Sequence, residues 1–171
     1  RLHPTSHLEC FWKYMNRKDI KVSFASVMPG LMWCPSRQDL VEQTSILQHS
    51  DVVLTPGSSW VLEAAIFDTP TIVPIYSDLQ PDHALAQFHR WTLARHYKPL
   101  RENGWVPITD SYHSTKSAVE EAFVQPGKHA QGRKAIVDNY VYFRNNGSAQ
   151  RVAEWIARNA GSVIPGRPRG F

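Results

Sequence analysis

Short apolar runs alternate along the chain with stretches in which apolar residues recur every three or four positions. Apolar runs of strand length occupy residues 20–25, 51–55, 71–75 and 105–109. The fourth run contains Pro107, which has no N–H to donate to a central ladder, so we expect this run at a sheet edge. A further strand is expected to end at His3, because Pro4 follows it directly.

Segments with a helical period separate these runs and continue after the last of them. The predicted helices span residues 8–17, 39–49, 58–67, 82–91, 114–124, 132–143 and 148–159, and Asp39 is the expected N-cap of the second. Strands that alternate with helices indicate an α/β fold with a mostly parallel sheet and helices on both faces. Such sheets bind ligands at the carboxyl ends of their strands, which here are the loops 26–37, 56–59 and 76–83.

The composition is that of an ordinary globular domain, since 42% of the 171 residues are hydrophobic and 20% are charged. We expect one domain over residues 1–160 and a flexible tail over residues 161–171, which are rich in Gly, Pro and Arg. No apolar run approaches the ~20 residues that a membrane span needs, and no signal-peptide pattern is visible. The chain begins with Arg1 rather than Met, which leaves open that it is a fragment.

The net charge and the spacing of the Cys and His residues indicate which classes of partner the chain can bind. The net charge of +4 is spread along the chain, which argues against a nucleic-acid partner and suits an anionic small ligand or an acidic membrane surface. Cys10 and Cys34 lack zinc-motif spacing and indicate reduced thiols in a cytoplasmic protein. The histidines also lack ligand spacing, because Pro4 separates His3 from His7, so we expect no metal site.

The segment 51–74, DVVLTPGSSWVLEAAIFDTPTIVP, holds the candidate chemistry. A buried strand leads into Pro56 and Gly57, and the glycine allows a sharp turn and a close approach to a ligand. Ser58 and Ser59 stand where the next helix begins, so they can cap its N–H groups and offer their hydroxyls. Free N–H groups and the positive end of the helix dipole favour an anion, typically a phosphate. A serine-capped helix without a ligand explains the same residues.

Glu63 favours the ligand over the plain cap. Its neighbours on the predicted helix are apolar, and a lone carboxylate among them is costly unless it has a partner. It lies one turn after Ser59 on the same face, about 6 Å along the axis, which is close to the separation between a diphosphate and the hydroxyls of its ribose. A carboxylate can accept from two adjacent hydroxyls. We therefore expect phosphates at the turn and ribose at Glu63; exposure to solvent or pairing with an arginine is the alternative.

Residues 57–76, GSSWVLEAAIFDTPTIVPIY, resemble the donor-site segment of GT-B fold glycosyltransferases, whose second, Rossmann-like domain binds a nucleotide-activated sugar. The spacing is similar to that of the lipid II-forming N-acetylglucosaminyltransferase. The stretches RLHP at 1–4 and NGSAQRV at 146–152 resemble CDP-glycerol glycerophosphotransferases and UDP-N-acetylglucosamine 2-epimerases. The resemblance covers residues 1–158. Where the family usually has a glycine in the helix-to-strand turn, this chain has Asp68, which suits the turn only if no positive φ is needed.

The resemblance implies a GT-B C-terminal domain, Rossmann-like and lacking its first βα unit, together with a set of ligand contacts. The implied contacts are Gly57, Ser58 and Ser59 for the diphosphate, Glu63 for the ribose, Val27, Met28 and Leu31 for the base, Asp78 and Gln80 for the sugar, and His3 beside the phosphates as the catalytic candidate. The donor would be a nucleotide diphosphate of the UDP or CDP type, with no cofactor and no metal.

The implied function is the donor-binding half of a nucleotide-sugar-dependent glycosyltransferase in cell-surface polysaccharide or glycolipid synthesis. An N-terminal domain missing from this chain would bind the acceptor, so the chain would be inactive alone. We expect it in the cytoplasm, either free or peripherally at the inner face of the membrane. A CDP-polyol phosphotransferase, a UDP-sugar 2-epimerase and a non-catalytic α/β module remain alternatives. The chain has neither a GxSxG elbow nor a GxxxxGK[ST] loop, which argues against a serine hydrolase and a P-loop NTPase.

Overall fold

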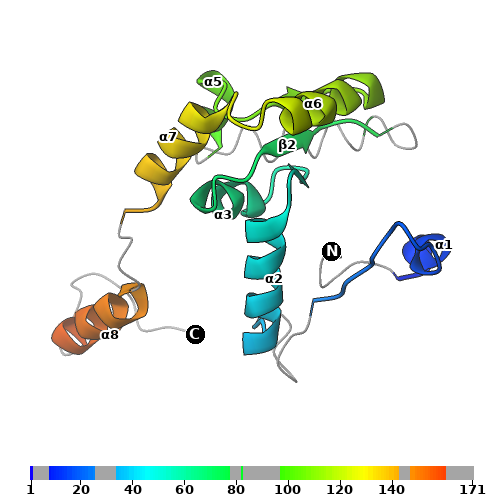
Figure 1. The fold of residues 1–171 in the computed structure, drawn as a ribbon. Helices are drawn as coiled ribbons and strands as arrows, with labels where there is room; N and C mark the ends of the chain where they lie inside the picture. The colour runs from blue at the N-terminus through cyan, green and yellow to red at the C-terminus, as the bar shows by residue number, and fades with distance from the viewer. Residues whose placement is uncertain (2–7, 26–33, 78–81, 83–96, 143–146, 161–171) are drawn as a thin grey trace.

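The computed structural model describes residues 1, 8–25, 34–77, 82, 97–142 and 147–160 (Figure 1). From α2 onward, short parallel strands alternate with helices, which confirms the expected α/β class. The described elements are the 3₁₀ helix η1 (Leu8–Phe11), α1 (Trp12–Met15), α2 (Arg37–His49), β1 (Val53–Leu54), α3 (Trp60–Ile66), β2 (Thr71–Pro74), α5 (Lys98–Glu102), β3 (Ile108–Thr109), α6 (Tyr112–Val124), α7 (Ala130–Tyr140) and α8 (Ser148–Asn159). None of these helices combines the length and apolar character that crossing a membrane requires.

The three described strands form one parallel sheet in the order β1-β2-β3. Val53 pairs with Thr71 across β1 and β2, and Val73 pairs with Ile108 across β2 and β3. The position of β3 at an edge of this sheet confirms the expectation drawn from Pro107, whose carbonyl accepts from Val73 N at 2.9 Å. β1 forms the other edge, and among the described residues no strand pairs with its outer side.

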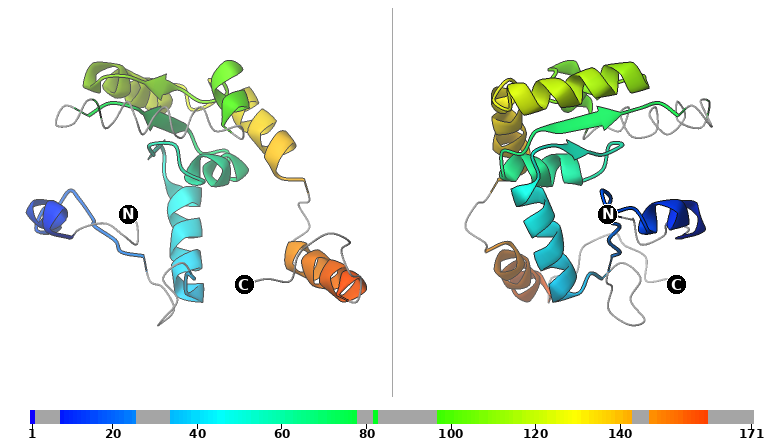
Figure 2. Two further views of the ribbon diagram at one scale, coloured as in Figure 1. Left: turned by 180° about the vertical axis from the view of Figure 1, so that it is seen from behind. Right: turned by 45° about the vertical axis from the view of Figure 1, so that its right-hand side comes forward.

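Helices cover both faces of the sheet, as the sequence predicts. On one face a single apolar cluster joins α3, α5 and α7 to β2 through Val61, Val73, Leu100 and Ile136. α6 lies on the opposite side of β2 from α3 (Figure 2), and a 2.7 Å hydrogen bond links Thr109 of β3 to Thr115 of α6. A second cluster, made by Leu47, Val53 and Ala64, packs α2 against β1 and α3.

The turn from α3 into β2 departs from the sequence expectation. Thr69 N donates to the Ala64 carbonyl at 3.0 Å and Asp68 N to the Ala65 carbonyl at 3.1 Å, which is the double hydrogen bond of a Schellman motif. Asp68 therefore adopts a φ of +56°, so the turn does need a positive φ and the condition under which an aspartate suits it is not met. The aspartate has a partner there, because its Oδ1 accepts from Arg133 Nε at 2.7 Å.

Several element boundaries also need correction. Residues 20–25 form no strand: Ile20 and Phe24 are 36% and 40% exposed, and no described strand lies beside them to cover an apolar face. The N-cap of α2 is Ser36 rather than Asp39, because Ser36 Oγ accepts from Asp39 N at 3.1 Å. The segment 8–17 forms only η1 and one turn of α1, and α3 begins at Trp60 rather than at 58. The prediction of α8 at 148–159 is confirmed.

Candidate functional site

The carboxyl ends of the strands meet at one edge of the sheet, because all three strands are parallel. The turn 55–59 follows β1, residues 75–77 follow β2, and residues 110–111 follow β3. The predicted ligand loops 56–59 and the start of 76–83 therefore share this edge, where α/β sheets bind ligands. Most of the third predicted loop, 26–37, lies outside the described residues.

A tight turn joins β1 to α3. Gly57 N donates to the Thr55 carbonyl at 2.8 Å, and Gly57 is buried with a φ of +70°, which glycine adopts without strain. The Ser58 hydroxyl lies 2.8 Å from Thr55 Oγ1 and accepts from Trp60 N at 3.3 Å. Ser58 thus caps the helix start as expected, whereas Ser59 makes no side-chain cap hydrogen bond.

Two adjacent backbone donors stay open in this turn. The N–H groups of Ser58 and Ser59 have no acceptor among the described residues. Beyond them the N–H groups are paired, since Val61 N bonds the Ser58 carbonyl and Glu63 N bonds the Ser59 carbonyl, each at 3.0 Å. Consecutive free N–H groups beside a glycine are a suitable lining for an anionic oxygen.

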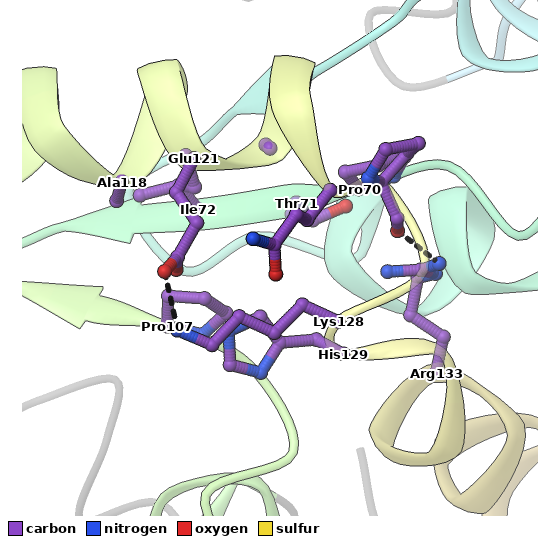
Figure 3. A pocket seen from close by; sticks show the side chains of 12 residues that line it. Pro70, Thr71, Ile72, Pro107, Ala118, Glu121, Lys128, His129 and Arg133 are labelled. Atoms are coloured by element: carbon purple, nitrogen blue, oxygen red, sulfur yellow. Dashed lines mark hydrogen bonds and ion pairs between the residues drawn. The ribbon is translucent and has the colours of Figure 1, made fainter.

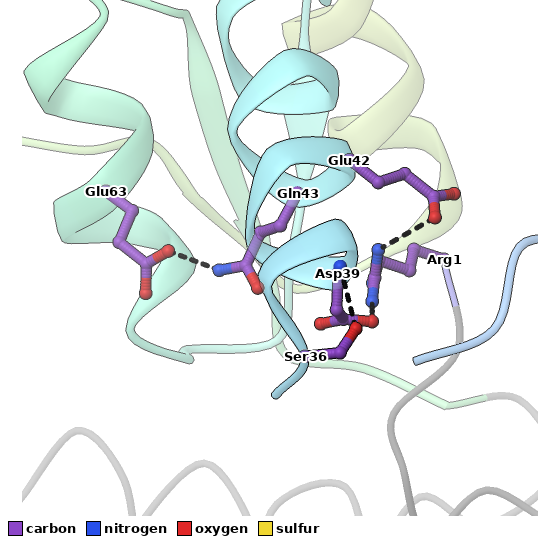
Figure 4. Close-up of polar contacts among 6 residues, drawn as sticks. All are labelled: Arg1, Ser36, Asp39, Glu42, Gln43 and Glu63. Atoms are coloured by element: carbon purple, nitrogen blue, oxygen red, sulfur yellow. Dashed lines mark hydrogen bonds and ion pairs between the residues drawn. The ribbon is translucent and has the colours of Figure 1, made fainter. Parts of the chain in front are cut away.

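Glu63 lies one helical turn after these donors and is half-buried. Its Oε2 accepts a hydrogen bond from Gln43 Nε2 of α2, and in Figure 4 its other oxygen points away from Gln43. Within the described part of the chain no arginine or lysine bonds Glu63, so the alternative of an arginine partner finds no support there. Glu63 lines none of the described cavities.

The surroundings of a buried tyrosine, Tyr97, raise its pKa. Burial raises the pKa of the Tyr97 phenol above its ordinary value, and the negative charges of Tyr140 and then Glu63 raise this pKa further. Tyr97 belongs to the apolar cluster that also contains Val61, which lies two residues before Glu63 on α3. The carboxylate therefore stands near the boundary between the core and the carboxyl edge.

A small cavity lies beside the glycine of the turn. Its volume is about 20 Å³, room for about one water molecule, and Gly57, Val61, Tyr97 and Arg101 are among its lining residues. Arg101 thus places a cation at the wall of the cavity that Gly57 also lines, and its Nη2 lies 3.5 Å from Glu102 Oε1, a carboxylate that is itself exposed. The sequence offers no signal for Arg101, because residues 92–104 have no recognisable period.

A second cavity of about 20 Å³ lies at the opposite, amino edge of the sheet, where Pro70 precedes β2 and Thr71 and Ile72 begin it (Figure 3). Its cations are already compensated: Lys128 pairs with Glu121, and Arg133 bonds Asp68 and the carbonyl of Pro126 at 2.9 Å. Its position and its internal ion pairs indicate a structural role in holding α7 to the sheet.

The remaining predicted contacts lie outside the described residues: His3, Val27, Met28, Leu31, Asp78 and Gln80. The structure therefore brings together the turn residues and Glu63 but places none of the other six. Within the described ranges, no group of three His, Cys, Asp or Glu side chains could hold a metal ion.

Sequence reasoning missed Gln43, although a signal exists. Gln43 precedes the fully buried Leu47 by four residues, so it lies on the face of α2 that packs inward. A polar residue on a buried face needs a partner, and Glu63 is that partner.

Comparison of the chain with protein-family models, with curated proteins and with solved structures finds no match.

Proposed function

We propose that this chain is the donor-binding half of a nucleotide-sugar-dependent glycosyltransferase, with the Rossmann-like architecture of a GT-B C-terminal domain. The observation that carries the proposal is the half-buried carboxylate of Glu63 one helical turn after a Gly-Ser-Ser turn whose Ser58 and Ser59 N–H groups find no acceptor within the described residues. This arrangement lies at the carboxyl edge of a parallel sheet, which is the usual ligand edge.

The turn would hold the diphosphate of the donor. The N–H groups of Ser58 and Ser59 would donate to its oxygens, and Gly57 would let the backbone approach them closely. Arg101, which lines the same cavity as Gly57, would supply a positive charge. Glu63 would accept from the two adjacent hydroxyls of the ribose, since an ionised carboxylate has acceptor sites on both oxygens.

The chemistry would depend on orientation and on stabilising the departing nucleotide diphosphate. Donors aimed at the leaving group contribute most when they are fixed before the reaction, and the turn is fixed by the Thr55–Ser58 hydrogen bond. The acceptor and the general base would come from a further domain. His3, Asp78 and Gln80 keep their proposed roles beside the phosphates and the sugar.

Addition of UDP or CDP is expected to raise the thermal unfolding midpoint of the chain. At a concentration 100 times Kd, a ligand stabilises the folded state by about 2.7 kcal/mol, which for a chain of this size corresponds to roughly 5–10 °C. Glu63→Ala should remove most of this shift, because it deletes two charge-assisted hydrogen bonds and weakens binding about 100-fold. Differential scanning fluorimetry measures both variants.

Glu120→Ala is the matched control, because Glu120 is exposed on α6 and pairs only with Lys116 at 3.6 Å among the described residues. It should keep the full nucleotide response. A wild-type chain that binds neither UDP nor CDP would leave the non-catalytic α/β module as the explanation of the turn. If nucleotide binds, product analysis with the acceptor domain present separates the glycosyltransferase from a polyol phosphotransferase or a 2-epimerase.

A further inference from the structure

Gln43 and Glu63 form a polar contact between two helices that are otherwise joined by apolar packing. Gln43 Nε2 donates to Glu63 Oε2, and both side chains are half-buried (Figure 4). Leu47, one turn after Gln43, packs with Ala64, the residue that follows Glu63. The packed Leu47–Ala64 contact therefore fixes the distance between the two polar side chains.

Further polar contacts hold α2 in place at its amino end. Arg1 pairs with Asp39 and lies 3.7 Å from Glu42, so a cation stands beside both of these carboxylates. Gln43, by contrast, is a neutral donor and leaves the negative charge of Glu63 uncompensated within the described residues. A neutral partner orients a carboxylate without neutralising its charge, so the remaining acceptor sites can still take charge-assisted hydrogen bonds.

The hydrogen bond gives the two oxygens of the Glu63 carboxylate different roles. Gln43 occupies one acceptor site of Oε2 and sets the plane of the carboxylate, while Oε1 points away from α2 and keeps its acceptor sites (Figure 4). A pair of neighbouring hydroxyls needs a carboxylate held in one orientation, because a freely rotating one loses conformational entropy on binding.

We propose that Gln43 is a positioning residue that holds Glu63 for a vicinal diol, and that the Gln43–Glu63 pair selects ribonucleoside over 2′-deoxyribonucleoside diphosphates. This inference rests on the proposed function of the same site. A site built to bond a hydroxyl rejects the analogue that lacks it, because the acceptor is then left unsatisfied. Gln43 itself touches Glu63 and need not touch the ligand.

The test compares the affinities of UDP and 2′-deoxy-UDP, with CDP and 2′-deoxy-CDP in parallel, for the wild-type chain, Gln43→Met and Gln48→Met. Isothermal titration calorimetry supplies each Kd. We expect the wild-type chain to prefer the ribonucleotide by at least about 10-fold. Gln43→Met should reduce this preference to within about 3-fold, mainly by lowering the affinity for the ribonucleotide. Gln48→Met, an identical change on the exposed side of α2, should leave the preference unchanged.

The outcomes separate this inference from the function on which it rests. If the wild-type chain binds no nucleotide, the proposed function fails. If the wild-type chain binds the ribonucleotide and the deoxyribonucleotide equally, or if Gln43→Met keeps the wild-type preference, the selection role of Gln43 is overturned. Nucleotide binding itself then still stands. An equal loss of affinity for the ribonucleotide and the deoxyribonucleotide in Gln43→Met would show that Gln43 only supports the fold. Gln43→Ala, with unfolding midpoints measured without ligand, repeats the test if the methionine variant does not fold.

Discussion

Gly132→Ala is expected to lower the free energy of unfolding by about 3 kcal/mol, at the upper end of the range for overpacking. A Cβ at position 132 would lie 2.3 Å from the carbonyl oxygen of Trp105 and 2.8 Å from its Cα. Both atoms belong to the backbone, so no side-chain rotation relieves the clash and α7 must shift as a unit. The gain of about 1 kcal/mol in helix propensity offsets only part of this cost. Urea denaturation measures the change.

Alanine substitutions at two other glycines are the controls for this clash, because neither introduces a steric contact. Gly127 has no atom within 4 Å of an added Cβ, and its φ lies outside the left-handed region, so Gly127→Ala should change stability by less than about 1 kcal/mol. Gly104 also has open space but a φ of +61°, so Gly104→Ala should cost about 1–2 kcal/mol through strain alone. Equal losses for Gly132→Ala and Gly127→Ala would contradict the close approach of α7 to Trp105.

Asp68→Ala is the second change with a large expected effect, a loss of about 2–3 kcal/mol in the free energy of unfolding. The substitution places an ordinary Cβ residue at a φ of +56°, which costs about 1 kcal/mol or slightly more. It also leaves the guanidinium of Arg133, only 5% exposed, with the Pro126 carbonyl as its remaining acceptor within the described part of the chain. The Asp68 side chain is 69% exposed, so water replaces part of the lost interaction.

Asp68→Gly and Asp68→Asn separate the two causes of the lost stability, which are the backbone strain and the loss of the ion pair with Arg133. Glycine relieves the backbone but removes the ion pair, so it should be about 1 kcal/mol more stable than alanine at this position. Asparagine tolerates the left-handed region and keeps an acceptor oxygen, so it should lose least. Thermal and urea unfolding of the three variants give the order. A glycine variant that is less stable than the alanine variant would refute the backbone strain.

Local sequence pattern predicts the fold class well because each feature involved is local. Alternating apolar runs and helical periods predict the parallel sheet, and Pro107 alone places β3 at an edge. The cap at Ser58 follows from its position after Gly57 at the end of a strand. The run 20–25 has the same local pattern as a strand but forms none in the structure, because a strand also requires a neighbour that its own residues do not encode.

The parts that sequence reasoning missed depend on contacts between distant residues. Gln43 and Glu63 are 20 positions apart, and Asp68 and Arg133 are 65 positions apart. Asp68 combines a positive φ, set by the local turn, with a bond to Arg133 across that separation. Arg101 belongs to a five-residue helix, α5, which is too short to show a period. Pattern along the chain can mark a residue that needs a partner, as at Glu63 and Gln43, but it cannot show which distant residue that partner is.

The outer side of β1, which pairs with no strand in the described part of the chain, has a consequence for assembly. Val53 N and Thr55 N bond to β2, so the N–H and carbonyl groups of Leu54 face away from the sheet, and Leu54 is 52% exposed. Backbone groups that face outward at a strand edge in this way are a template for one more extended segment. The sheet can therefore grow outward from β1 without disturbing the turn at its carboxyl end. If no such segment is supplied, the same outward-facing groups favour pairing between copies in concentrated solution.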